Sequence, residues 1–257
     1  MRRDIVVVLV GLLVLCGVAG TRSAMAGQLY VKYYPSKATK HQREYAAQRT
    51  LEDALGLVNG IINPNSLSRD VEVAVEDCGQ VNAFYSPTRK RITICYELLD
   101  FLLSTSQKIP GDSGERGRAF YQMAHFIVLH EVGHMFQDIL KRGGLGNRES
   151  EADYFAAVVA ISAGKEGAEM AANGSLLFMT WSKGQVIRFN DEHPPAASRA
   201  YDIMCLVYGS KPKEYSALGV QLGDARRRRC AAEYQPTFQA WKKHLQPVLV
   251  GGGSGRQ

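Results

Sequence analysis

The feature that most constrains this chain is the pentapeptide His130-Glu131-Val132-Gly133-His134, an H-E-x-x-H pattern within an apolar segment. An α-helix has 3.6 residues per turn, so two histidines four residues apart project from one helical face. Two imidazoles on one face can bind a zinc ion and leave positions for a third ligand and a water molecule. Glu131 lies between them and can accept a proton from that water. The pattern therefore predicts a helix that supplies two metal ligands and a general base.

A third ligand is expected from the acidic residues that precede the next apolar helix, 152–160. Glu149 and Asp153 are four residues apart and share a helical face. Glu149 can bind the metal, and Asp153 can accept a hydrogen bond from the far ring nitrogen of a ligand histidine. Acidic residues also favour the first turn of any helix, where they complement the helix dipole. Glu151 is therefore kept as an alternative third ligand.

Several motifs together resemble the gluzincin metallopeptidases, the clan that contains thermolysin. They are H-E-x-x-H at 130–134, E-x-x-x-D at 149–153, N-A-F-Y at 82–85, and H-P at 193–194 followed by Arg199. Cys78-Gly79, the segment 94–98 and Cys205 with Tyr208-Gly209 extend the similarity to a secreted bacterial family of uncharacterised metallopeptidases. This similarity spans residues 29–235. The chain departs from that family at residues 146–148, where acidic residues are commoner, and this leaves the register of the third ligand open.

The resemblance implies an enzyme that hydrolyses peptide bonds in a peptide or protein substrate with one Zn²⁺. In that reading Glu131 removes a proton from the attacking water and delivers it to the leaving amine. The carbonyl oxygen becomes an anion and needs a further hydrogen-bond donor. His193 is the candidate donor, with Arg199 either assisting or orienting it. His193 also lies in a polar segment and fits an ordinary surface histidine equally well.

The N-A-F-Y segment predicts a substrate-binding edge strand. An exposed strand edge offers unpaired N–H and C=O groups, to which an extended peptide can add as another strand. Asn82 and Ala83 are the candidate substrate-binding residues of this segment, together with Arg199 further along the chain, and the Asn82 amide can reach the substrate backbone. Alternatively, Asn82 caps a turn and Phe84 belongs to the core.

Two other functions remain open from the sequence. A zinc-stabilised scaffold or binding protein needs the metal ligands but not the base, so the presence of Glu131 favours an enzyme. A hydrolase of a non-protein amide, such as a cell-wall cross-link, would use the same residues on another substrate.

Residues 1–26 are expected to be a signal peptide. Arg2 and Arg3 precede an apolar run from Ile5 to Ala19, and Ala24-Met25-Ala26 fits a cleavage site. The run is short for a membrane-spanning helix, although a retained anchor is the alternative. We expect residues 27–250 to form a single metallopeptidase-like domain, with no stable membrane span after cleavage, and the glycine-rich residues 251–257 to form a disordered tail. The protein is then periplasmic or secreted from a bacterium.

Four cysteines remain after this cleavage, an even count that indicates disulfides in an exported protein. Sequence alone permits three pairings. We favour Cys78–Cys95, which brackets a hairpin, and Cys205–Cys230, which joins two C-terminal segments. A zinc site built from cysteines is the competing interpretation, but none of the four lies in a C-x-x-C pair.

The charge of the chain does not indicate a nucleic-acid partner. The formal net charge is +6, and removal of the +2 carried by residues 1–26 leaves about +4. Much of this charge lies in the run Arg226–Arg229, which has no interleaved aromatic residues. A solvated helix face is therefore the favoured interpretation of that run.

The order of the elements predicts an α+β fold. Strands are expected at 29–33, 71–75, 82–85 and 91–96, and helices at 41–62, around the H-E-x-x-H motif, at 152–160, 167–180, 196–208 and 231–245. We predict a small, mostly antiparallel N-terminal sheet with an edge strand at the cleft, then an active-site helix, then a helical C-terminal part.

Overall fold

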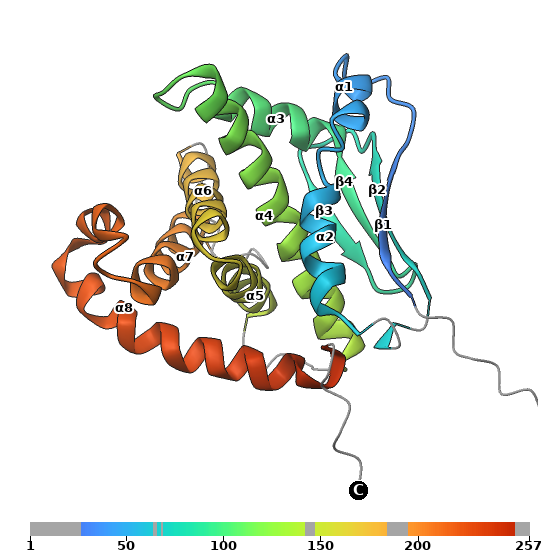
Figure 1. The fold of residues 1–257 in the computed structure, drawn as a ribbon. Coiled ribbons are helices and arrows are strands. Elements are labelled where there is room, and N and C mark those ends of the chain that lie inside the picture. The colour runs from blue at the N-terminus through green and yellow to red at the C-terminus, as the bar shows by residue number, and fades with distance from the viewer. Residues whose placement is uncertain (1–26, 64–65, 68, 142–146, 184–194, 250–257) are drawn as a thin grey trace, which may run out of the picture.

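The computed structural model describes residues 27–63, 66–67, 69–141, 147–183 and 195–249. Helix α4 runs between the sheet on one side and helices α5, α6 and α7 on the other (Figure 1). The strands are β1 (Leu29–Tyr33), β2 (Val71–Glu76), β3 (Ala83–Ser86) and β4 (Arg91–Cys95). The helices are α1 (Gln42–Ala47), α2 (Glu52–Ile61), α3 (Tyr96–Ser106), α4 (Ser113–Ile139), α5 (Arg148–Ser162), α6 (Lys165–Ser182), α7 (Ala196–Ser210), α8 (Ser216–Leu245) and the short 3₁₀ helix η2 (Gln246–Val248). The α+β class predicted from the sequence is confirmed.

The sheet is mixed, so the prediction of a mostly antiparallel sheet is wrong. Its strand order is β1-β2-β4-β3, and both the β1/β2 and β2/β4 pairs are parallel. Only β3 runs antiparallel, against β4. The chain between β1 and β2 forms α1 and α2, and such a helical connection returns the chain to pair in the parallel sense. β4 then inserts between β2 and β3, which leaves β3 as an edge strand.

Two local features of the N-terminal part differ from expectation. The helix predicted at 41–62 is divided into α1 and α2, because Arg49 between them has a left-handed backbone (φ 49°). An L-residue in that conformation interrupts a right-handed helix. A further helix, α3, begins directly after β4 and was not predicted. Its first residue, Tyr96, is buried and donates a hydrogen bond from its hydroxyl to the Tyr34 carbonyl at 2.8 Å.

Helix α4 forms the centre of the core. Asp112 caps its N-terminus in a capping box with Glu115, in which each side chain accepts a hydrogen bond from the other residue's backbone N–H. From Ala119 to Gln137 most of its side chains are buried, including Phe126, and it packs against α3, α5, α6 and β3. A helix that is apolar around its whole circumference is expected to be covered on all sides. The H-E-x-x-H segment therefore lies inside the molecule.

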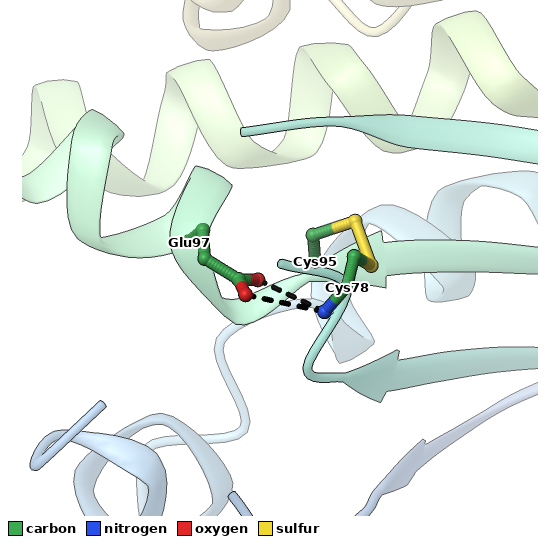
Figure 2. A group of neighbouring side chains, drawn as sticks. All are labelled: Cys78, Cys95 and Glu97. Atoms are coloured by element: carbon green, nitrogen blue, oxygen red, sulfur yellow. Dashed lines mark hydrogen bonds between the residues drawn. A yellow bond between two sulfur atoms is a disulfide. The ribbon is translucent and has the colours of Figure 1, made fainter. Parts of the chain in front are cut away.

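Both disulfides favoured from the sequence are present. Cys78–Cys95 joins the segment after β2 to the end of β4, and Cys205–Cys230 joins α7 to α8. Figure 2 shows the Glu97 carboxylate beside the first disulfide, where it accepts hydrogen bonds from the backbone N–H of Cys78. Because both sulfur atoms are oxidised, this group offers no thiolate for a metal ion. The competing cysteine-zinc interpretation is therefore not supported.

Some predicted features fall outside the described residues. They are the signal peptide at 1–26, the tail at 251–257, and His193 within 184–194. Among the residues that the structure describes, no helix has the length and apolar character needed to cross a bilayer.

Candidate metal centre and active site

Helices α4 and α5 bring three potential ligand side chains to one point. His130 and His134 project from α4, and Glu149 lies in the first turn of α5. The Nε2 atoms of the two histidines are 3.1 Å apart. The Glu149 carboxylate lies 3.3 Å from His130 Nε2 through one oxygen and 3.2 Å from His134 Nε2 through the other. Asn147 fixes this turn, because its side chain accepts hydrogen bonds from the N–H groups of Glu149 and Ser150.

This triangle of donor atoms fits a tetrahedral zinc ion. Ligand atoms about 2.0–2.1 Å from a tetrahedral centre are separated from one another by about 3.3 Å. In the structure the two Nε2 atoms are 3.1 Å apart, and each lies 3.2 or 3.3 Å from a different oxygen of the Glu149 carboxylate. One donor atom from each of the three residues lies within 4.8 Å of the other two. Two imidazole nitrogens and one carboxylate are also the donor set of catalytic zinc sites, in which the fourth position stays open.

The far ring nitrogen of His130 is bound by Asp153, one turn after Glu149 on α5. Its Nδ1 lies 2.9 Å from Asp153 Oδ1, and Asp153 is itself buried. A proton on Nδ1 that is donated to this carboxylate leaves Nε2 as an acceptor directed at the triangle. Burial lowers the pKa of His130, but the charge and hydrogen bond of Asp153 outweigh this and raise the pKa to about 9. Asp153 thus makes the ring a stronger base and a stronger ligand.

Arg199 of α7 forms an ion pair with the carboxylate of Asp153. Its Nε and one terminal nitrogen donate to the two carboxylate oxygens of Asp153 at 2.6 and 2.9 Å. The Arg199 side chain is only 10% exposed, and its guanidinium carbon lies over the Phe178 ring, 4.0 Å from the ring centre. The same terminal nitrogen lies 3.7 Å from Glu149. These contacts orient Asp153, whereas the role expected for Arg199 beside His193 is not tested, because His193 lies outside the described residues.

The far ring nitrogen of His134 is bound by Gln137, a residue to which the sequence analysis gave no role. The Gln137 Oε1 atom lies 3.2 Å from His134 Nδ1, and its Nε2 donates to the Arg148 carbonyl at 2.7 Å. Gln137 is buried, and these two partners satisfy its amide together with the Glu151 carboxylate, 3.5 Å from its Nε2. It therefore orients the second histidine and ties it to the start of α5. The sequence signal is an amide three residues after His134, close enough along the helix for its side chain to reach that histidine.

Glu131 is buried beside the two histidines. Its Oε2 atom has no hydrogen-bond partner among the described residues. Burial raises the pKa of this carboxyl, and the neighbouring histidines reduce that shift. A buried carboxylate oxygen without a partner is rare in a folded protein and is expected to serve a ligand or a reaction. Glu151, the alternative third ligand, lies away from the triangle, with its carboxylate 3.5 Å from Gln137 Nε2.

The edge strand β3 lies against α4, as expected, and its backbone pattern defines the open edge. Cys95 N–H donates to the Asn82 carbonyl, and the register pairs Ala83 with Ile94 and Tyr85 with Ile92. Hydrogen-bonded and non-hydrogen-bonded pairs alternate in an antiparallel ladder. The backbone groups of Ala83 and Tyr85 are therefore directed away from β4, to the open edge. The Asn82 side chain accepts a hydrogen bond from the Ala83 N–H at 3.0 Å, as a local cap would.

Residues 30–245 match the model of a family described as "Putative metallopeptidase". The chain belongs to this family. The resemblance to an uncharacterised metallopeptidase family that the sequence motifs indicated is thereby confirmed, over most of the chain. No curated protein and no solved structure matches the chain.

Proposed function

We propose that this protein is a gluzincin-type zinc peptidase, in which His130, His134 and Glu149 hold one Zn²⁺ and Glu131 is the general base. The observation that carries the proposal is the convergence of these four side chains, three as a triangle of donors and the fourth as a buried carboxylate beside it. A zinc ion bound there supplies a Lewis acid that polarises the substrate carbonyl and lowers the pKa of a water molecule towards about 7.

The roles of the protein groups follow from their positions. Glu131 accepts a proton from the attacking water and returns it to the leaving amine nitrogen, so no proton is lost over the cycle. Asp153 and Gln137 hold the two histidine rings with Nε2 directed at the metal position. Arg199 holds Asp153. His193 remains our candidate donor to the developing oxyanion.

The substrate is proposed to be a peptide in an extended conformation. It would pair with the open edge of β3 through the backbone groups of Ala83 and Tyr85. The Ala83 N–H would then exchange its hydrogen bond with Asn82 for one with the substrate carbonyl, which frees the Asn82 amide to contact the substrate as well. Because β3 packs against α4, a peptide paired at this edge would lie beside the helix that carries Glu131.

We further propose that the protein acts outside the cytoplasm, in the periplasm or as a secreted protein. Two disulfides in a chain of this size are typical of an oxidising compartment. The sequence expected of a signal peptide at residues 1–26 supports the same conclusion. Intact-mass analysis of exported protein should show cleavage after Ala26 and no free thiols.

The decisive experiment compares wild-type protein with Glu131→Gln. Both should contain about one zinc per chain, because glutamine leaves the three ligands in place. Hydrolysis of unfolded casein should fall at least about 100-fold in kcat, since the amide cannot act as a carboxylate base. Glu169→Gln, which changes an exposed carboxylate on α6, is the matched control and should retain full activity. Casein cleavage that survives both Glu131→Gln and removal of zinc by a chelator would contradict the proposed site.

A further inference from the structure

A contact between the edge strand and the metal-binding helix lies outside the metal site itself. The Tyr85 hydroxyl on β3 donates a hydrogen bond to Asp138 Oδ2 on α4 at 2.8 Å. The Lys90 ammonium, from the turn between β3 and β4, binds the same carboxylate oxygen. Asp138 is one helical turn after His134. A single carboxylate thus connects the last turn of the metal-binding helix to both the edge strand and its turn.

Tyr85 belongs both to the open backbone edge of β3 and to the contact between β3 and α4. Its backbone N–H and C=O are directed to the open edge, and its side chain is held by Asp138. Burial raises the pKa of the Tyr85 hydroxyl, and Asp138 raises it further, so this group remains a hydrogen-bond donor. The position of its backbone groups relative to α4 therefore depends on a hydrogen bond to a charged partner, one of the stronger kinds in proteins.

Lys90 adds a second constraint on the same strand. Its backbone is left-handed (φ 52°), a conformation that is unfavourable for a residue with a side chain. The strained turn directs the ammonium to Asp138, where the ion pair offsets part of the cost. β3 pairs with one strand only, and an edge strand of four residues is weakly fixed by its own ladder. Contacts with α4 must therefore supply the remaining stabilisation of β3 in its position.

We propose that Asp138 is a positioning residue that fixes the open edge of β3 relative to α4 and so determines how tightly an extended peptide binds. This inference rests on the proposed peptidase function for its kinetic consequence. Within the described part of the chain, the hydrogen bonds and the ion pair given for Asp138 are with Tyr85 and Lys90, so its effect should appear in KM while metal binding is unchanged.

The test uses Tyr85→Phe and Asp138→Ala in the full-length protein with unfolded casein as substrate. Both variants should raise KM roughly five- to thirty-fold, keep kcat within about two-fold and retain one zinc per chain. The matched control is Tyr30→Phe on β1, at the opposite edge of the same sheet, which removes a tyrosine hydroxyl that donates to the Glu72 carboxylate. It should leave KM unchanged. An unaltered KM in Tyr85→Phe, or loss of zinc from it, would overturn the proposal.

Hydrogen exchange separates this inference from the proposed function. In Tyr85→Phe, amides of 83–95 should exchange faster than in wild type, while those of α4 are unchanged. If wild-type protein cleaves no casein, the proposed function fails, and exchange alone decides whether Asp138 holds the strand. Unchanged exchange in 83–95 would then refute the positioning role. Tyr85→Phe removes a single oxygen atom, so this variant remains informative even if Asp138→Ala does not fold.

Discussion

Gly133 of α4 lies directly against Ala152 of α5. A Cβ atom placed on Gly133 would be 2.9 Å from the Ala152 Cα and 3.2 Å from its Cβ. The two helix backbones can approach this closely only because the fourth residue of the H-E-x-x-H pattern is glycine. Gly133 directly precedes His134, and Ala152 follows Glu149 by three residues, about one helical turn. The distance between the histidine pair and the third donor is therefore set by the absence of one methyl group.

Gly133→Ala should separate α4 from α5 and weaken metal binding. The added methyl group meets backbone atoms of Ala152, which cannot rotate away, so overpacking should lower the free energy of unfolding by about 1–3 kcal/mol. The displaced Glu149 should also lower zinc affinity. Urea unfolding and competition with a zinc-binding dye measure the two effects.

Gly117→Ala is the matched control for this substitution. Gly117 lies in the same helix, and a Cβ placed there meets no atom within 4 Å. Because alanine favours helix more than glycine does, this variant should be stabilised by about 0.5–1 kcal/mol and bind zinc normally. Equal effects of the two substitutions would show that the close approach at Gly133 does not position the ligands.

Replacement of Gln137 or Asp153 should weaken zinc binding through the histidine rings. Gln137→Leu and Asp153→Ala each remove the acceptor for one ring Nδ1, which should cost roughly 10- to 100-fold in metal affinity. Only Asp153→Ala removes the carboxylate that accepts both hydrogen bonds from Arg199, leaving Glu149 at 3.7 Å, so this variant should also lose stability. Measurements of zinc affinity and of urea unfolding should then distinguish the two variants, because both lose zinc affinity and Asp153→Ala also loses stability. Wild-type zinc affinity in Gln137→Leu would show that His134 needs no orienting partner.

Glu149→Ala should weaken zinc binding more than Glu151→Ala. The Glu149 carboxylate reaches both histidine Nε2 atoms, whereas that of Glu151 lies near the Gln137 amide. Metal content after dialysis against a weak chelator measures the difference. If Glu151→Ala were the more damaging substitution, the third ligand would have to be reassigned.

The parts of the site that follow from helical spacing could be predicted from the sequence. His130 and His134 share a face because they are four apart, and the same holds for Glu149 and Asp153. Each pair is local, so its geometry depends on the helix alone. That the two pairs meet was expected from the position of the acidic pair at the start of the next helix and was supported by the family resemblance, and in the structure Glu149 lies beside both histidines.

The contacts that the sequence could not predict join segments that are distant in the chain. Asp138 and Tyr85 are 53 residues apart, and nothing in either local pattern indicates their contact. The direction of β2 and β4 likewise depends on strand order, which a residue alternation does not encode. Gln137 lies three residues after His134, but its role also requires the Arg148 carbonyl on another helix.

The interactions of Asp138 with Lys90 and Tyr85 should make the free energy of unfolding depend on pH in the acidic range. Burial would raise the pKa of Asp138, but hydrogen bonds from Lys90 and Tyr85 outweigh it and hold the pKa below its usual value. A carboxyl whose pKa is lowered by folding stabilises the protein at pH values above its unfolded pKa, about 3.9. That contribution is lost as the pH falls through the lower, folded pKa.

Wild-type protein should thus be more stable than Asp138→Asn at pH 7, with the difference shrinking below about pH 4. Urea unfolding of both proteins at pH 7 and near pH 3 measures it, and Lys90→Met should reduce the difference at pH 7. A difference that is the same at both pH values would mean that the charge of Asp138 does not contribute to its hold on β3.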